Sequence, residues 1–149
     1  KDLRTAYQAF WKRVSPGLKP VAIDLGDPSE NPAVLCSQDW RPETGNPPWN
    51  FSSIKKSPKV THPWLVNVLK AGKYRFTLRQ WPKEADKTIA GVKARIKIAG
   101  LEEETVIKDG SKEINFTLTL PSGITELWTY IYNQQGQVGG AYFTEVEKL

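Results

Sequence analysis

The sequence predicts a mainly β fold, an antiparallel β-sandwich with one helix at its N-terminus. Three observations lead to this prediction: a helical period at the start of the chain, a period of two in its second half, and turn signals between short apolar segments. The length of 149 residues fits one domain with a core of its own. A composition of 39% hydrophobic and 25% charged residues is that of an ordinary globular protein.

The helix is expected in the first residues, where one apolar stripe follows the helical period. Asp2 can cap this helix, and Ser15-Pro16-Gly17 ends it. The stripe consists of Leu3, Tyr7, Phe10, Trp11 and Val14. A stripe on a single helix needs a second surface to cover it, supplied either by the rest of the chain or by a domain upstream. Since the chain has no Met, we expect it to be a piece of a longer protein, with a helix and linker at 1–19 and a sandwich domain at 20–149.

Short strands are expected along most of the sandwich domain. The predicted strands are 21–25, 33–36, 64–69, 73–81, 89–99, 101–107, 114–120, 126–132 and 140–146. Asp109-Gly110 is a strong hairpin signal, and other turns with Gly or Pro separate the remaining strands. Strands of this number and spacing are typical of a sandwich of the jelly-roll or galactose-binding-like type.

Alternation of side chains assigns faces to these strands. The residues predicted to point into the core are Tyr74, Phe76 and Leu78, then Val92, Ala94, Ile96 and Ile98, and then Phe116, Leu118 and Leu120. The opposite face of 73–81 carries Arg75, Thr77, Arg79 and Trp81. Strand 126–132 has apolar residues on both faces, so its orientation stays open. One face carries Leu127 and Ile131, and the other carries Trp128, Tyr130 and Tyr132.

A long connection is expected at 37–63, which holds five prolines and little regular period. Its two tryptophans, Trp40 and Trp49, favour an ordered loop. Together with Trp81 they lie beside prolines and near loops. Tryptophans in such places form flat stacking surfaces for sugars or bases, wedge a loop onto a sheet, or fill a domain interface.

Charge is unevenly distributed along the chain, whose net charge is +5. Residues 55–97 hold twelve basic side chains against Glu84 and Asp86, whereas residues 98–149 hold eight acidic and three basic ones. The basic region either meets a polyanion or lies beside the acidic strands, where cross-strand pairs cancel the charge. The second interpretation is favoured, because exposed charges usually do no more than solvate a face.

The sequence contains no recognisable catalytic or metal-binding pattern. A lone Cys36 excludes an internal disulfide, and a lone His62 excludes a site with two imidazoles. We expect Cys36 to be an inert buried thiol and His62 to be a turn or surface residue. Turn and capping roles suit the cluster Asp24, Asp27, Glu30, Asn31 and Asp39 better than calcium binding. No apolar run approaches the ~20 residues of a membrane span, so no membrane partner is expected.

Five motifs carry a resemblance to a known family. They are Tyr7-x-x-Phe10-Trp11-x-x-Val14-Ser15-Pro16; Glu30-Asn31-Pro32 leading to Gln38-Asp39-Trp40; Pro48-Trp49-Asn50; Ala71-Gly72-x-Tyr74-x-Phe76-x-Leu78-Arg79-x-Trp81-Pro82-Lys83-Glu84-Ala85; and Gly140-Ala141-Tyr142-Phe143. In this order, over most of the chain, they resemble the C-terminal region of bacterial secreted sulfatases of the arylsulfatase type. The stretch from Leu78 to Pro82 is the most specific.

The resemblance implies a non-catalytic accessory domain that follows the sulfatase catalytic domain of the same chain, in the periplasm or outside the cell. Such sulfatases hydrolyse sulfate esters with calcium and a formylglycine made from Cys or Ser, and both belong to the catalytic domain. The modification motif has Pro two residues and Arg four residues after the Cys, where Cys36 is followed by Gln38 and Trp40. No catalytic residue, metal ligand or cofactor is therefore expected in this domain. Arg41 and Phe51 replace a His and a Gln that are frequent in the family.

The candidate binding residues are Arg75, Arg79, Trp81, Trp40 and Trp49. We expect them at the seam with the catalytic domain or in a sugar groove. The main hypothesis is a structural accessory domain of a sulfatase. The alternatives are a carbohydrate-binding module for anionic or sulfated glycans and a nucleic-acid-binding domain. The last is disfavoured, since no recognised nucleic-acid-binding motif is present and basic residues that alternate with core residues need no nucleic acid.

Overall fold

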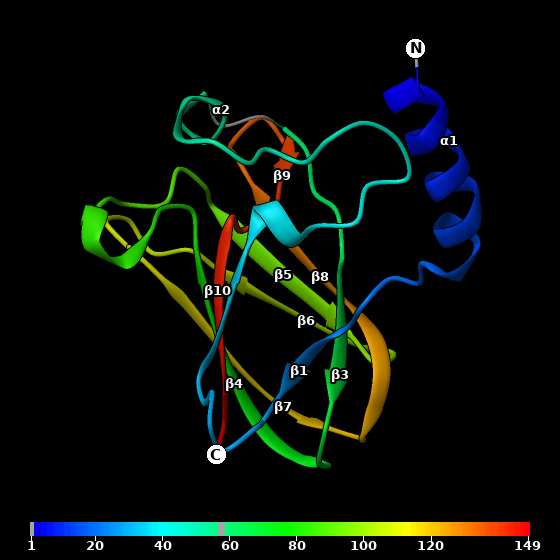
Figure 1. Cartoon of the computed structure of the whole chain (residues 1–149). Helices are drawn as coiled ribbons and strands as arrows, with labels where there is room; N and C mark the ends of the chain where they lie inside the picture. Colours follow the sequence, from blue (N-terminus) through cyan, green and yellow to red (C-terminus); the bar gives the residue numbers. More distant parts are fainter. Residues whose placement is uncertain (1, 57–58) are drawn as a thin grey trace.

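The computed structural model describes residues 2–56 and 59–149. Lys1 lies outside this range, as do Ser57 and Pro58 of the predicted long connection. Two β-sheets pack face to face, and one helix stands apart from them (Figure 1). The strands are β1 (Ile23–Leu25), β2 (Ala33–Cys36), β3 (Trp64–Val68), β4 (Gly72–Arg79), β5 (Lys93–Ile98), β6 (Leu101–Val106), β7 (Ile114–Leu120), β8 (Gly123–Tyr132), β9 (Val138–Gly139) and β10 (Phe143–Lys148). The helices are α1 (Asp2–Val14) and the short α2 (Phe51–Lys55), with single turns η1 (Ser15–Gly17), η2 (Ser37–Asp39) and η3 (Lys83–Ala85).

The sheet topology confirms a mainly β fold with one N-terminal helix. The first sheet has the order β1-β3-β8-β5-β6, with β9 beside β8, and the second has the order β2-β10-β4-β7. All pairs are antiparallel except β1 and β3, which run parallel. The first sheet is therefore mixed rather than purely antiparallel. Parallel neighbours need a long crossover connection. Between β1 and β3 the chain forms β2 of the second sheet and then the connection 37–63.

The core lies between the sheets, where alternation predicted it. In β4 the side chains of Tyr74, Phe76 and Leu78 are fully buried, and the inward residues of β5 and β7 are buried as well. Val92 is the exception, since it is 38% exposed. It precedes the first residue of β5, so its side chain does not follow the period of the strand.

Strand β8, whose orientation the sequence left open, turns its aliphatic side inward. Leu127, Thr129 and Ile131 are buried between the sheets. Trp128, Tyr130 and Tyr132 are half-buried on the outer face of the first sheet. The one polar residue of the inner set, Thr129, accepts a hydrogen bond from the Ala141 N–H at 3.1 Å.

The connection between β2 and β3 is ordered by local caps and by bonds to the sheets. The Asn50 side chain accepts a hydrogen bond from the Ser53 N–H at 2.8 Å and so caps α2. The Ser37 hydroxyl donates to the Pro48 carbonyl at 2.6 Å, and the Trp64 indole N–H donates to the Cys36 carbonyl at 2.7 Å. These bonds hold the loop over one end of the sandwich.

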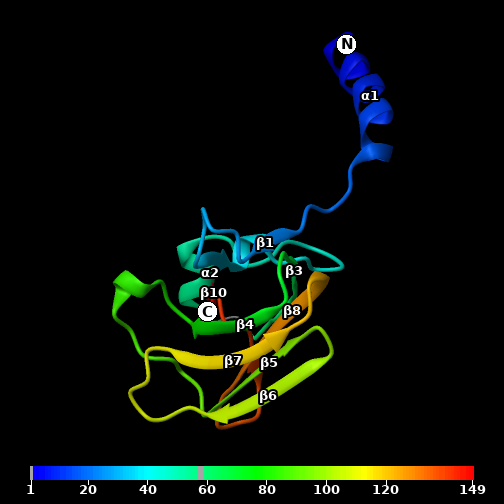
Figure 2. The same ribbon diagram turned by 90° about the horizontal axis from the view of Figure 1, so that it is seen from below.

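Helix α1 packs against no other described part of the chain. None of its residues is buried, and Leu3, Tyr7, Phe10 and Trp11 are between 48% and 85% exposed. Figure 2 shows the helix standing away from the sandwich at the end of an extended segment. The apolar stripe predicted from the sequence is therefore present and uncovered.

Candidate functional site

The predicted arginines of β4 are paired with glutamates of neighbouring strands. Arg75 forms an ion pair with Glu147 of β10. Arg79 bonds Glu113 and also places Nη1 2.9 Å from Glu145 Oε1. The Arg79 side chain is only 11% exposed, because β4 lies between β10 and β7. The basic region thus meets acidic strands, as the cross-strand interpretation predicted.

The predicted tryptophans do not converge on one surface. Trp40 is 2% exposed and belongs to the core, where its ring packs against Trp64 and Tyr142 at centroid distances of 5.6 and 5.5 Å. Trp49 is exposed near α2, on the loop. Trp81 is half-buried after β4, with Lys87 Nζ 4.7 Å from its ring centroid. Trp40 therefore wedges the loop onto the sheets and offers no surface to a ligand.

Cys36 and the acidic cluster have local structural roles. Cys36, predicted to be buried, is only half-buried at the end of β2. Its thiol lies 3.3 Å from Asp39 Oδ2, and partial burial, aided by the Asp39 carboxylate, raises the pKa of the thiol. Asp27 accepts two hydrogen bonds from Ser29, and both lower the pKa of Asp27. The Asn31 side chain ties its loop to the backbone of Lys148. Across residues 2–56 and 59–149, no three Cys, His, Asp or Glu side chains are grouped to hold a metal ion.

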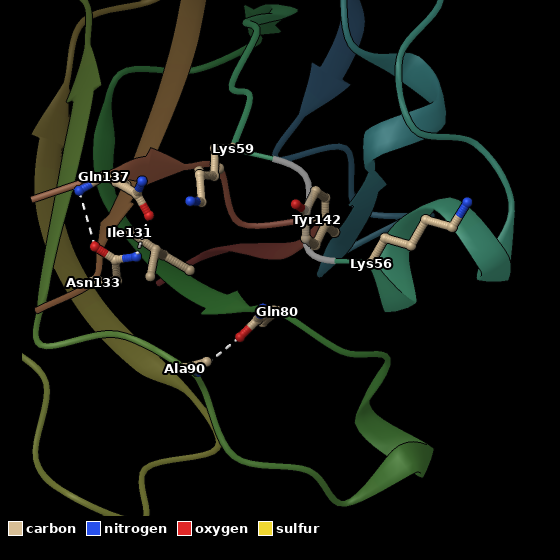
Figure 3. A pocket seen from close by; sticks show the side chains of 10 residues that line it. Lys56, Lys59, Gln80, Ala90, Ile131, Asn133, Gln137 and Tyr142 are labelled. Atoms are coloured by element: carbon tan, nitrogen blue, oxygen red, sulfur yellow. Dashed lines mark hydrogen bonds between the residues drawn. The ribbon is translucent and has the colours of Figure 1, made fainter. Parts of the chain in front are cut away.

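A pocket of about 320 Å³ lies between the end of β4, the β8–β9 hairpin and α2 (Figure 3). Its buried wall includes Gln80, Ile131 and Tyr142, and Lys56 and Lys59 lie at its rim. The Gln80 amide oxygen accepts from the Ala90 N–H at 2.8 Å. Burial raises the pKa of Tyr142 to about 12. The pocket offers positive charge and no carboxylate among its described lining residues.

An aromatic row, defined as Trp128, Tyr130 and Tyr132, runs along the outer face of β8. Successive ring centroids are 6.2 and 6.4 Å apart, with interplanar angles of 6° and 26°. Two cations of the paired strand β5 lie over it. Arg95 Cζ is 4.3 Å from the Tyr130 centroid, and Lys93 Nζ is 4.6 Å from that of Tyr132. The sequence contained the signal for this row, three aromatic residues at i, i+2 and i+4, but alternation alone does not say which face is outside.

A hollow of about 420 Å³ adjoins the Trp128 end of the row. We call it the Trp128 hollow; its lining residues are Arg41, Glu43, Thr44, His62, Pro63, Glu126 and Trp128. The Trp128 indole N–H donates to Glu126 Oε2 at 2.9 Å. His62, expected as a turn or surface residue, is half-buried and packs edge-on against Trp40 at a centroid distance of 6.0 Å. The hollow therefore combines an aromatic wall with groups of both charges.

Comparisons with known proteins give one distant structural neighbour. No known family matches the sequence, and no curated protein matches it. The crystal structure of a ruminal GH26 endo-beta-1,4-mannanase is similar, with a TM-score of 0.48 and 20% sequence identity, over 79% of this chain. The match spans 26% of the mannanase chain. A search of the described helices finds none with the length and apolar character needed to cross a membrane.

Proposed function

We propose that this chain is the non-catalytic C-terminal accessory domain of a secreted sulfatase, and that α1 docks it onto the catalytic domain of the same polypeptide. The observation that carries the proposal is the uncovered apolar stripe of α1. Monomeric proteins rarely leave large apolar side chains grouped on one surface, and such groups usually mark an interface. Four such side chains, on a helix that packs on no other described part of the sandwich, fit a contact with another domain.

The sequence motifs give the partner its identity. The resemblance to arylsulfatase-type C-terminal regions supplies a catalytic domain as the occupant of the α1 surface. Two further observations support a structural role. Arg79, the arginine of the most specific stretch, is paired with Glu113 and Glu145, and Trp40 of the second motif fills the core. These motif residues hold the sandwich together and leave chemistry to the catalytic domain.

Cys36 is treated in this proposal as a structural thiol. A reactive thiolate needs a lowered pKa, whereas burial raises that of Cys36. The resemblance to sulfatases assigns calcium and formylglycine to the catalytic domain of the parent enzyme. A periplasmic or extracellular location follows from the same resemblance.

The test starts from the coding sequence immediately upstream of residue 1, where we expect a sulfatase catalytic domain. In that longer polypeptide, Phe10→Ser combined with Trp11→Ser should lower both the Tm and the hydrolysis of an aryl sulfate. The isolated chain should keep its urea midpoint after the same change, because α1 buries nothing there. Ile124→Ser, at another exposed apolar residue, is the matched control and should leave the longer polypeptide unchanged. Release of sulfate by the isolated chain, or an unrelated upstream sequence, would contradict the proposal.

The second candidate function is a carbohydrate-binding module for anionic or sulfated glycans. The pocket in Figure 3 favours it, because Lys56 and Lys59 are among its lining residues and no carboxylate is among those that the structure describes, although the Lys56 amine points away from the cavity. Binding of a chondroitin sulfate hexasaccharide should then fall steeply with added salt, and Lys56→Gln with Lys59→Gln should abolish it. Affinity that is insensitive to salt would count against this pocket.

A further inference from the structure

We propose that the aromatic row and the Trp128 hollow form a saccharide-binding site, in which a pyranose ring stacks on Trp128 and its hydroxyl groups bond in the hollow. This inference does not depend on the accessory role proposed above. It also uses a surface different from the Arg75, Arg79 and Trp81 side of the second sheet.

The row is held in place without a ligand. Arg95 lies over Tyr130 and bonds Glu102 Oε1 at 3.0 Å. Lys93 lies over Tyr132 and bonds Glu104 at 3.1 Å. Each cation is thus paired with a carboxylate of β6 as well as with a ring, and these contacts favour the observed ring positions before any ligand binds.

Trp128 is the ring of the row that remains available to a ligand. Among the described residues, the cations lie over Tyr130 and Tyr132 and none lies over Trp128. Its neighbour Tyr130 stacks on it at 6.2 Å, and its N–H is bonded to Glu126. The indole is therefore fixed in orientation at the mouth of the hollow.

The walls of the hollow are tied to the first sheet by hydrogen bonds. The Arg41 N–H donates to the Pro63 carbonyl at 2.8 Å, next to the buried Trp40. Next to the lining residue His62, the Thr61 hydroxyl donates to the Thr129 carbonyl of β8 at 2.7 Å. The hollow is thus a built feature of the fold, and its volume lies in the range of about 300–1,000 Å³ that is common for ligand pockets.

The chemistry of the lining suits hydroxyl groups. The Glu126 carboxylate uses Oε2 for the indole, and the Arg41 guanidinium has a bond of 3.4 Å to the Val21 carbonyl. The hollow therefore holds a positively charged donor, Arg41, and a negatively charged acceptor, Glu126. The hydroxyl groups of a sugar can both donate and accept hydrogen bonds, so they suit this pair. Nucleic acid, which also stacks on tryptophan, is disfavoured because Glu43 and Glu126 would repel its phosphates.

The experiment titrates the full 149-residue chain with three probes: cellohexaose, xylohexaose and a chondroitin sulfate hexasaccharide. We expect at least one probe to bind with a millimolar or tighter Kd and to shift the Trp128 indole N–H signal in a ¹H–¹⁵N spectrum. Trp128→Ala should weaken this binding about tenfold or more, as expected for a lost stacking surface. Trp81→Ala tests the rival surface predicted from the sequence; it removes a half-buried tryptophan that follows β4, and binding at Trp128 requires that this change leave the Kd unchanged.

Two results would overturn the proposal. One is the absence of any shift with all three probes at millimolar concentration. The other is binding that survives Trp128→Ala but is lost in Trp81→Ala or in the Lys56 and Lys59 variant. If Trp128→Ala does not fold, Trp128→Phe and Arg41→Met probe the same ring and the same hollow, and each must weaken binding for the proposal to stand.

Discussion

Replacement of Arg79 by Met tests whether the ion pairs of the second sheet matter for stability. Arg79 is largely buried, and the change leaves Glu113 and Glu145 without their shared cation. Removal of one partner from a fully buried pair costs about 3–5 kcal/mol. The side chains of Glu113 and Glu145 are 44% and 26% exposed, and water therefore solvates the abandoned charges in part. We expect a loss of about 2–3 kcal/mol in the free energy of unfolding.

Arg75→Met is the matched control. It removes a cation from the same face of β4, but the Arg75 side chain is 48% exposed and its partner Glu147 is 34% exposed. A surface pair of this kind contributes about 0–1 kcal/mol. Urea melts followed by tryptophan fluorescence at pH 7 measure both variants. A loss for Arg79→Met no larger than that for Arg75→Met would refute the reasoning.

The pH dependence of the same variant gives an independent check. Burial alone would raise the pKa of Glu113, but hydrogen bonds from Arg79 and Asn115 outweigh it and lower the pKa below the ordinary 4.5. A lowered carboxyl pKa adds stability above the unfolded pKa, and this stability is lost as the pH falls through the folded pKa. The wild type should therefore lose stability below about pH 4.5, and Arg79→Met should lose less over that range. Parallel pH profiles would contradict the assigned role.

Three further changes test the core. Phe76→Ala should cost about 3–5 kcal/mol in urea melts, because Phe76 is fully buried between the sheets. Gly140→Ala should cost about 1–3 kcal/mol and lower the Tm, since the added methyl carbon would lie 2.6 Å from Cζ2 of the buried Trp40; an unchanged Tm would mean that the loop is free to move away. Because folding raises the pKa of Tyr142, the protonated Tyr142 hydroxyl adds stability below pH 10, and this stability is lost as the pH rises towards 12. The loss should be about 2–3 kcal/mol in the free energy of unfolding. Denaturant melts of Tyr142→Phe should not show this loss at alkaline pH.

The features predictable from the sequence were those with a local period. Residues 73–81 alternate between aromatic or aliphatic and polar side chains, and Tyr74, Phe76 and Leu78 lie in the core as predicted. The parallel pairing of β1 with β3 had no such signal, because a strand has the same period whichever way its neighbour runs. The burial of Arg79 also escaped the pattern. Alternation correctly turned it away from the core, but the glutamates that cover it are 34 and 66 residues further along the chain.

The candidate sites depended even more on distant contacts. Trp40 lies in a loop without a period, and a neighbouring proline says nothing about depth, so its burial could not be predicted. The aromatic row was visible as an alternative in strand 126–132. The choice between its two faces depended on packing against the other sheet, which placed Leu127 and Ile131 inside.

The edge strand β6 of the first sheet carries a charge that opposes pairing with a further strand. Strand β6 lies at the sheet edge, and its Glu103 is paired in register with the buried Ile96, so the Glu103 carboxylate points to the inner side while remaining exposed. A second molecule that extended the sheet there would trap this charge away from water and set glutamates of two copies against each other. The edge should therefore reject strand addition, and Glu103→Val should make the domain more prone to association through β6.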